Sequence, residues 1–206
     1  MTTSSKIISP ASDKRQLSDN KRELIRQVII DHFSDALFQD VGIREICAAA
    51  GVTPKTIYKH FGNKEALLIK AIEPDMQQLN EALKAAENAP GSVQARFAAV
   101  GQAFISFYFS HIAVARIIFL NIPSAYFVSH PAFIQRTQLD VIHDLICEGQ
   151  KEGTIRQDVD ASELGEALAG ITMRTMYRYL TSTDPLPSAE DAADRLSQIT
   201  GPLLTA

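Results

Sequence analysis

A short stretch in the N-terminal third of the chain, residues 51–67, carries an unusual density of hydrogen-bond donors. It reads GVTPKTIYKHFGNKEAL, with threonine, lysine, tyrosine and histidine side chains around a single proline. Hydroxyl, ammonium and imidazole groups at this spacing can contact phosphates and base edges, which a DNA groove presents to a helix. The stretch is therefore a candidate nucleic-acid contact element.

Local signals place most of these donors on one short helix. Gly51 is suited to the end of a preceding helix, because glycine tolerates a positive φ. Thr53 is a good N-cap, and Pro54 fits the first helical turn. Gly62 then ends the helix, so we predict a helix over about 54–61.

Two more short helices are predicted before this one. Asn20 and Glu23 form a capping box ahead of apolar residues spaced by three and four, which predicts a first helix to about residue 38. A second helix covers about 42–49, with Asp40 available as its cap. The glycine-containing turn that follows makes the second and third helices a helix-turn-helix.

The third helix has one apolar and one polar face. Val52, Ile57 and Phe61 can seat it against the other two helices. A helix held this way can lie in the major groove of DNA, with its first residues at base edges and the flanking ones at phosphates. The side chains left for that role are Thr53, Lys55, Thr56, Tyr58, Lys59 and His60.

Composition predicts an all-α globular protein with an uneven charge distribution. The 206 residues are 46% hydrophobic and 21% charged, enough for a sizeable core, and strand signals are poor. The net charge is −4, but residues 1–70 carry 11 Lys and Arg against 8 Asp and Glu, while the remainder carries 9 against 16. A basic module joined to an acidic one explains this split.

Cysteine and histidine spacing does not predict a metal site. Cys47 and Cys147 lie in apolar helical patterns, where buried, reduced thiols are expected and a thiol switch is the alternative. His111, His130 and His143 have no close spacing among themselves. We therefore expect neither a metal nor a cofactor.

The first residues of the chain and its expected location are predicted from composition. Residues 1–17 form a mobile, mildly basic arm, and the absence of a signal segment or a long apolar run predicts a cytoplasmic protein.

Asn63 caps a long fourth helix from Lys64 to about Ala89. Pro74 lies inside it and predicts a kink or a break.

The run from Gly51 to Leu67, with Ile46 and Ala50 before it, resembles the recognition helix and the start of the connecting helix in the TetR family of transcriptional regulators. The resemblance covers about residues 20–70. It implies an all-α protein with an N-terminal three-helix DNA-binding domain and a helical ligand-binding and dimerisation domain. The predicted division is a flexible arm over 1–17, the helix-turn-helix domain over 18–64 and the ligand-binding and dimerisation domain over 65–206.

The resemblance also implies roles for single residues. Positions that face bases or nearby backbone are matched by Arg44, Thr53, Lys55, Thr56 and Lys59, and phosphate contacts by Tyr58, His60 and Lys64. The chain departs from the family at Leu37, where glycine is usual, and at Val41 and Gly42, which replace a Thr-Thr pair. The backbone N–H of Gly42 can substitute for the lost hydroxyl contact.

From Ser92 onward the chain predicts further helices, over 93–111, 112–120, about 131–151, about 160–181 and about 188–204, with an inward stripe rich in aromatics. An apolar pocket for a small ligand is implied by the family resemblance, and ordinary core packing is the alternative. Candidate ligand-binding residues are Phe104, Tyr108, His111, Phe119, Tyr126, Phe133, Met173 and Tyr177.

Small residues recur at helical spacing over residues 161–176, a face that permits close helix approach. A two-fold four-helix interface with the final helix is one interpretation, and packing within the chain is the other; the resemblance favours a dimer. The predicted dimer interface consists of Gly165, Leu168, Ala169, Thr172, Met176, Leu196, Ile199 and Leu203.

These features favour a dimeric, ligand-responsive regulator, most simply a repressor released from a near-palindromic DNA operator by a small, largely apolar or aromatic effector. An activator is also open. The alternatives are a sequence-indifferent DNA-binding organiser and a thiol-responsive regulator without a small-molecule effector. An enzyme is not expected, because no Ser/His/Asp or Cys/His arrangement and no phosphate-binding glycine loop stands out.

Overall fold

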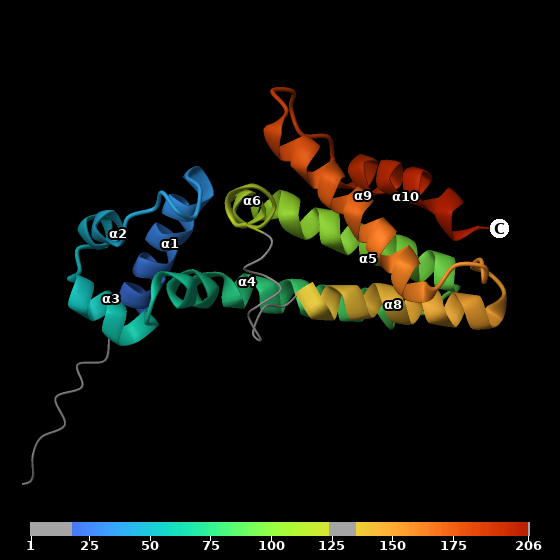
Figure 1. Cartoon of the computed structure of the whole chain (residues 1–206), viewed down its shortest axis with the longest axis horizontal. Coiled ribbons are helices and arrows are strands. Elements are labelled where there is room, and N and C mark those ends of the chain that lie inside the picture. Colours follow the sequence, from blue (N-terminus) through green and yellow to red (C-terminus); the bar gives the residue numbers. More distant parts are fainter. Residues whose placement is uncertain (1–17, 124–134, 206) are drawn as a thin grey trace, which may run out of the picture.

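The computed structural model describes residues 18–123 and 135–205, and these ranges contain helices and turns without a strand. The all-α prediction is confirmed. In Figure 1, α1, α2 and α3 lie together at one end, and α4 runs from α3 toward the opposite end, below α5, α6, α9 and α10 in this view. The elements are α1 (Asp19–Asp35), α2 (Ile43–Ala50), α3 (Pro54–Phe61), α4 (Lys64–Glu87), α5 (Val93–Ser110), α6 (Ile112–Arg116), the π-helix η1 (Ile117–Asn121), α8 (Gln135–Glu152), α9 (Ala161–Thr181) and α10 (Ala189–Leu204).

The N-cap of the first helix is Ser18, two residues before the predicted cap Asn20. The Ser18 hydroxyl accepts a hydrogen bond from the Lys21 backbone N–H at 3.3 Å. The predicted capping box of Asn20 and Glu23 is wrong, because Asn20 already lies inside α1. The Glu23 carboxylate instead lies 2.8 Å from a guanidinium nitrogen of Arg26 one turn later.

The second helix starts without a side-chain cap. Its N-cap is Gly42, in an extended conformation, so the prediction that Asp40 caps this helix is wrong. Asp40 lies instead in a turn, in which its backbone N–H donates to the Leu37 carbonyl at 2.9 Å. The chain therefore turns between α1 and α2 through backbone hydrogen bonds.

The long fourth helix is predicted correctly at its start, and of the kink or break predicted at its proline, the break does not occur. Asn63 is the N-cap, and its side-chain oxygen accepts from the Ala66 N–H at 2.7 Å. The helix continues through Pro74, so the predicted break does not occur. The proline is exposed, whereas Ile72 and Met76 on either side of it are buried and hold both halves of the helix against the core.

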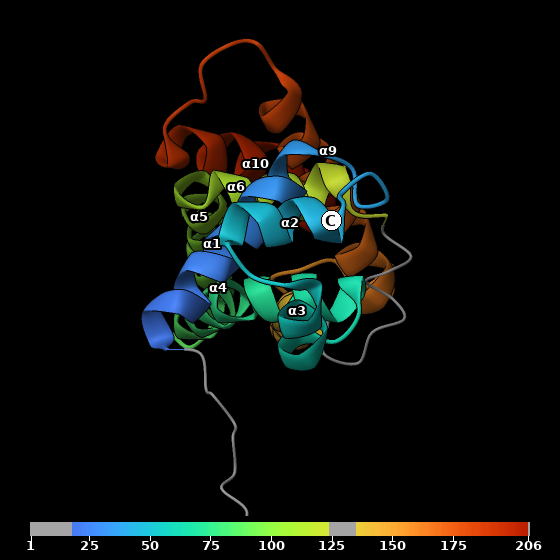
Figure 2. The same ribbon diagram turned by 90° about the vertical axis from the view of Figure 1, so that its left-hand side faces the viewer.

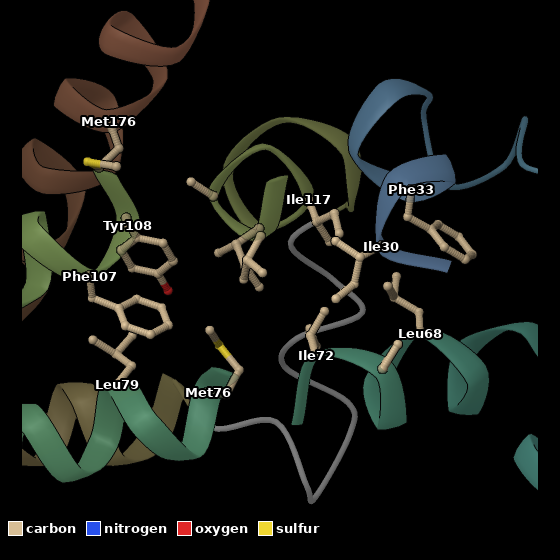
Figure 3. Packing of buried hydrophobic residues seen from close by; sticks show 14 of the residues in the cluster. Ile30, Phe33, Leu68, Ile72, Met76, Leu79, Phe107, Tyr108, Ile117 and Met176 are labelled. Carbon is tan, nitrogen blue, oxygen red and sulfur yellow. The ribbon is translucent and has the colours of Figure 1, made fainter. Parts of the chain in front are cut away.

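One hydrophobic core runs through both ends of the molecule. Figure 3 shows Ile30 of α1, Leu68 and Ile72 of α4 and Ile117 of η1 near one another, and the same cluster continues to Met176 of α9. The predicted domain boundary after residue 64 falls at the first residue of α4, where this core has no gap. The division into two domains stays a prediction, and the packing joins the two parts mechanically.

Among the described residues, no single helix is long and apolar enough to cross a membrane. One pair, Val93–Ser110 with Ile112–Asn121, has the required length and composition only when taken together, and it is bent by 102°.

Candidate DNA-binding and ligand sites

The turn between α2 and α3 is built around Gly51. Its φ of 60° lies in the left-handed region, where a side chain would be strained. The N–H of Gly51 donates to the Ala48 carbonyl, and that of Val52 donates to the Cys47 carbonyl at 3.0 Å. These bonds close the end of α2 and direct the chain into α3, which lies below α2 in Figure 2.

The third helix is held by its cap and by one buried side chain. The Thr53 hydroxyl accepts from the Thr56 N–H at 3.3 Å, and Pro54 occupies the first turn, as predicted. Ile57 has no exposed surface and anchors the helix in the core. The outer face is therefore free, and Tyr58 on it is 53% exposed.

The predicted DNA-binding residues do not share one environment. The exposed ones are Arg44, Thr53, Lys55, Tyr58 and Lys59, and the partly buried ones are Thr56, His60 and Lys64. The exposed set lies on α2 and along α3, which together face the viewer in Figure 2. Their roles toward DNA remain predictions.

Lys64 is engaged inside the protein. Its ammonium donates to the Gln39 carbonyl at 3.2 Å and lies 4.8 Å from the ring centre of Phe38 and 5.9 Å from that of Phe33. Burial lowers the pKa of Lys64, and the charge of Asp40 opposes this effect. Lys64 thus fastens the start of α4 to the segment after α1.

Two further lysines bond to helix ends. The Lys21 ammonium donates to the Ala50 carbonyl at the end of α2 at 2.7 Å. The Lys70 ammonium donates to the His60 carbonyl near the end of α3 at 3.2 Å. Lysine is favoured at such ends because carbonyls there lack helical partners. Part of the positive charge counted in residues 1–70 therefore supports the helix-turn-helix itself.

A buried ion pair joins α1 to α4. The Arg26 guanidinium donates to the Ala71 carbonyl at 2.8 Å and pairs with the carboxylate of Asp75, which is only 8% exposed. Burial alone would lower the pKa of Arg26, but the hydrogen bonds and charges of Asp75 and Glu23 raise it. The contact lies beside Pro74 and ties the DNA-binding helices to the middle of α4.

A second link joins α1 to η1. The Asn121 side-chain amide donates to the carbonyls of Phe33 and Ser34 at 2.9 and 2.7 Å, at the end of α1. Arg116 donates to the same Ser34 carbonyl at 3.1 Å. The Phe38 backbone N–H in turn donates to the Asn121 carbonyl at 2.8 Å. The end of α1 is thus held by the segment that also reaches the cavity described next.

The helical part of the molecule encloses a cavity of about 430 Å³. Its walls come from α4, α5, η1, α8, α9 and α10 and from the segment after α8. Most of the lining is apolar. The residues that face it are Leu83, Val93, Gln94, Phe97, Ala98, Val100, Gly101, Phe104, Tyr108, Ile118, Phe119, Gln138, Leu139, Ile142, Thr154, Ile155, Leu168, Ala169, Thr172, Met173, Leu196, Ser197, Thr200, Gly201, Leu204 and Thr205.

Four predicted ligand-binding residues line this cavity: Phe104, Tyr108, Phe119 and Met173. The first three form a cluster of edge-on rings, with centroids 4.9 to 6.3 Å apart. Their convergence from α5 and η1 gives the cavity an aromatic wall.

His111 and Tyr177 are not among the lining residues. His111 ends α5, where its ring stacks on Phe107 at 4.3 Å and its Nδ1 lies 2.9 Å from the Phe107 carbonyl. Tyr177 is exposed beneath the Arg174 guanidinium, 5.2 Å from the ring centre. Tyr126 and Phe133, the remaining predicted ligand residues, lie outside the described residues.

The sequence did not indicate the polar part of the cavity wall. Gln138 of α8 hydrogen-bonds to Tyr108 of α5. Thr172 and Thr200 bring hydroxyls from α9 and α10. An amphipathic pattern in α8 and α10 marks an inward face, but it does not show which polar residues on that face meet a hollow.

The predicted dimer residues mostly face inward. Met176 has no exposed surface, and Gly165, Leu168 and Leu196 are also buried within the protomer. Ala169, Thr172 and Leu203 are partly buried, and Ile199 is exposed. The small-residue face of α9 therefore packs within the chain, which is the alternative interpretation of that pattern. Small side chains bring α9 close to its own neighbours.

The two thiols differ in environment. Cys47 is buried, and burial raises its pKa, so that it stays protonated and unreactive. Cys147 is partly exposed, and its Sγ lies 3.4 Å from Nε2 of His143 one turn earlier. Within the described residues, no group of three or more His, Cys, Asp and Glu side chains could hold a metal ion.

An exposed recognition helix at one end and a cavity-bearing helical part at the other together have the architecture of a DNA-binding regulator. Residues 29–71 match the family of bacterial regulatory proteins named for tetR. The chain is also 23% identical over 203 residues to the HTH-type transcriptional regulator EthR of Mycolicibacterium smegmatis, and the match covers 97% of this chain and 94% of that protein.

Solved structures share the fold over nearly the whole chain. FadR from Bacillus subtilis in complex with stearoyl-CoA superposes with a TM-score of 0.74 at 17% identity, covering 89% of this chain and 99% of that one. The ketosteroid regulator KstR2 of Mycobacterium tuberculosis gives a TM-score of 0.72 at 19% identity, covering 93% and 97%. These comparisons support a transcriptional regulator of the TetR type: residues 29–71 match the family model, and the fold is shared over nearly the whole chain.

Proposed function

We propose that this regulator is a dimeric repressor that leaves a near-palindromic operator when a small, largely apolar effector enters the cavity. The observation that carries the proposal is the placement of the cavity. Phe119 lines it, and Asn121, two residues later in the same π-helix, holds the end of α1. The relatives named above are transcriptional regulators, and one of them was solved with a bound acyl thioester.

The coupling works through a difference in affinity. An effector that fits the cavity better in one arrangement of η1 pulls the equilibrium toward that arrangement. Because Asn121 and Arg116 bond to the carbonyls that end α1, a shift of η1 moves the helix-turn-helix relative to α4. Full release requires a strong preference of the effector for the DNA-incompetent arrangement, roughly 10⁴-fold for a complete switch.

Dimerisation uses the outer surface of α9 and α10 in this proposal. Met173, Tyr177 and Ile199 are large apolar residues that are 44%, 47% and 53% exposed. Exposed large apolar residues are candidates for an interaction site, because a contact between two copies would remove them from water. A two-fold contact here would place the same surface of both protomers together and leave each α3 free.

Operator binding is tested by selecting duplexes from a random DNA pool with the full chain at about physiological salt, where non-specific binding is weak. Enrichment of a two-fold symmetric site is expected. Retention of DNA without a shared sequence would point instead to a sequence-indifferent organiser, and absence of retention would contradict DNA binding.

The dimer surface is tested separately. Ile199→Glu should convert the protein to a monomer in light scattering, because it places a charge on the proposed apolar contact. Gln198→Glu adds the same charge at the neighbouring exposed position on α10 and serves as the control. Equal behaviour of the two variants would move the interface elsewhere.

A further inference from the structure

The cavity wall offers no full charge to a ligand. Every described residue that faces it is apolar, glycine, or carries a neutral amide or hydroxyl group. An ionised group buried against such a wall loses its hydration without a compensating partner. A ligand that lies inside is therefore best accommodated if it is uncharged.

One polar pair stands out within this wall. Tyr108 is only 1% exposed, and Gln138 of α8 hydrogen-bonds to its hydroxyl oxygen. Burial raises the pKa of Tyr108, although the Gln138 bond acts in the opposite direction, so the hydroxyl keeps its proton. With the amide as donor to the oxygen, the Tyr108 proton is available to an acceptor on a ligand.

The hydroxyls of Thr172 and Thr200 in the wall differ from that of Tyr108 in whether they can donate a hydrogen bond to a ligand. Thr172 donates to the Leu168 carbonyl and Thr200 to the Leu196 carbonyl, each at 2.8 Å. Their protons are engaged along their own helices, so these hydroxyls can only accept from a ligand. The donors in this part of the wall are therefore the Tyr108 hydroxyl and the second N–H of the Gln138 amide, and a ligand oxygen is the group that they fit.

The size of the cavity limits the ligand. A volume of about 430 Å³ holds roughly fourteen small non-hydrogen groups, if each occupies about 30 Å³ as a water does in the liquid. This is the size of a medium-chain or two-ring compound. The aromatic wall of Phe104, Tyr108 and Phe119 suits either shape.

The surroundings disfavour a polyanionic ligand such as a coenzyme A thioester. After Lys70 the chain carries 9 Lys and Arg against 16 Asp and Glu. The exposed lining residues Gln94, Ser197 and Thr205 are neutral as well. Several phosphates would need cations at the entrance, and none of the described lining residues supplies one.

We propose that the cavity binds an uncharged, apolar molecule of this size that presents one oxygen acceptor, a ketone, ester or ether oxygen, to the hydroxyl of Tyr108. The inference rests on the proposed function, because it assigns the cavity as the effector site. It adds the chemical class of the effector and the residue that recognises its polar group.

The test uses the full chain without DNA and the neutral fluorophore N-phenyl-1-naphthylamine as a reporter. The protein contains no tryptophan that would obscure the signal. Four competitors share one chain length: dodecane, 2-dodecanone, dodecanoate and dodecanoyl-CoA. We expect 2-dodecanone to displace the reporter best, with dodecane next and the two anions at least tenfold weaker, because each anion must be desolvated.

Two tyrosine variants test the hydrogen bond. Tyr108→Phe should weaken displacement by 2-dodecanone about fivefold to tenfold, the usual worth of one hydrogen bond, and leave dodecane unchanged. Tyr179→Phe is the matched control. Its hydroxyl is also buried, has no hydrogen-bond partner in the described structure and does not line the cavity. Circular dichroism of both variants establishes that the helical fold is kept.

Stronger displacement by dodecanoate or dodecanoyl-CoA would overturn the proposed class of ligand, and so would an equal loss of ketone binding in both tyrosine variants. Failure of the reporter to bind, together with no rise of the melting temperature on addition of 2-dodecanone, would overturn the cavity as a binding site. These results are independent of the duplex selection. If an operator is found and an anion binds the cavity best, the proposed function as a regulator still holds, and only the proposed class of ligand is wrong.

Discussion

The DNA-facing end and the cavity-bearing part of the molecule are built on different principles. At the DNA-facing end, the exposed face of α3 is set by the local signals Gly51, Thr53 and Pro54, all within four residues. The cavity takes its wall from six helical elements, from Leu83 to Leu204. Local caps fix the first site, whereas long-range packing fixes the second.

This contrast makes the junction the informative place to mutate. Arg26 with Asp75, and Asn121 with the end of α1, connect the two parts through side chains. If the parts act as one mechanical unit, a change at the junction should affect both. Changes on α3 or near the far end of α4 should remain local.

The largest effect is expected from Asp75→Ala. It leaves the partly buried Arg26 guanidinium without its main partner, which should lower the free energy of unfolding by about 3 kcal/mol. Glu23→Ala removes the exposed partner of the same guanidinium and should cost less than about 0.5 kcal/mol. Urea unfolding measures both. Similar costs for the two variants would mean that the buried pair does not hold α1 on α4.

Asn121→Ala comes next. It leaves the carbonyls of Phe33 and Ser34 without their amide donor and should cost about 2 kcal/mol. Asn88→Ala removes a comparable bond from an exposed helix end, to the Lys84 carbonyl, and should cost less than about 0.5 kcal/mol.

The same Asn121→Ala variant probes communication between the parts. The variant should respond less to an effector in operator binding, at effector concentrations that saturate the cavity. Undiminished release would place the coupling in α4 alone.

A smaller difference is expected between the effects of replacing Lys59 and Lys64, two lysines at the DNA-facing end. Lys59 is exposed on α3, whereas the Lys64 ammonium is bonded to Gln39 and lies over Phe38. Lys59→Ala should lower the slope of log affinity against log salt concentration by about 1. Lys64→Ala should change the slope less and lower the stability of the helix-turn-helix. Equal slope changes would mean that Lys64 leaves its internal partners to bind a phosphate.

The parts that could be predicted from the sequence are those governed by neighbours in the chain. Thr53, Asn63 and Gly62 were predicted correctly as helix boundaries because caps act over three or four residues. Asn20 was predicted wrongly as a cap because the nearby Ser18 could also serve, and Asp40 because α2 starts at Gly42 without a side-chain cap. The all-α class followed from helical periodicity together with the poor strand signals of the sequence.

The parts of the structure that could not be predicted depend on which face of a helix turns inward. The small residues of α9 left open a partner helix or packing within the chain; Gly165 and Met176 pack within the protomer, while Met173 and Tyr177 are exposed. Periodicity gives the faces of a helix but not the neighbour of each face. The aromatic residues Phe104 and Phe119 were found because they are large, whereas Gln138 was not, because a single amide on an amphipathic helix carries no local signal.

The smallest effect is expected far from the junction, at the end of α4. Burial, followed by the nearby charge of Asp144, raises the pKa of Glu87 above its ordinary value. A carboxyl group with a raised folded-state pKa stabilises fully only below its unfolded pKa, and this contribution is lost as the pH rises through the folded value. Glu87→Gln should therefore raise the free energy of unfolding near pH 7 by less than about 1 kcal/mol and leave it unchanged near pH 4. Glu81→Gln, at an exposed position on the same helix, is the control. Thermal unfolding at the two pH values measures the difference, and a gain that persists near pH 4 would show that the Glu87 charge is not its cause.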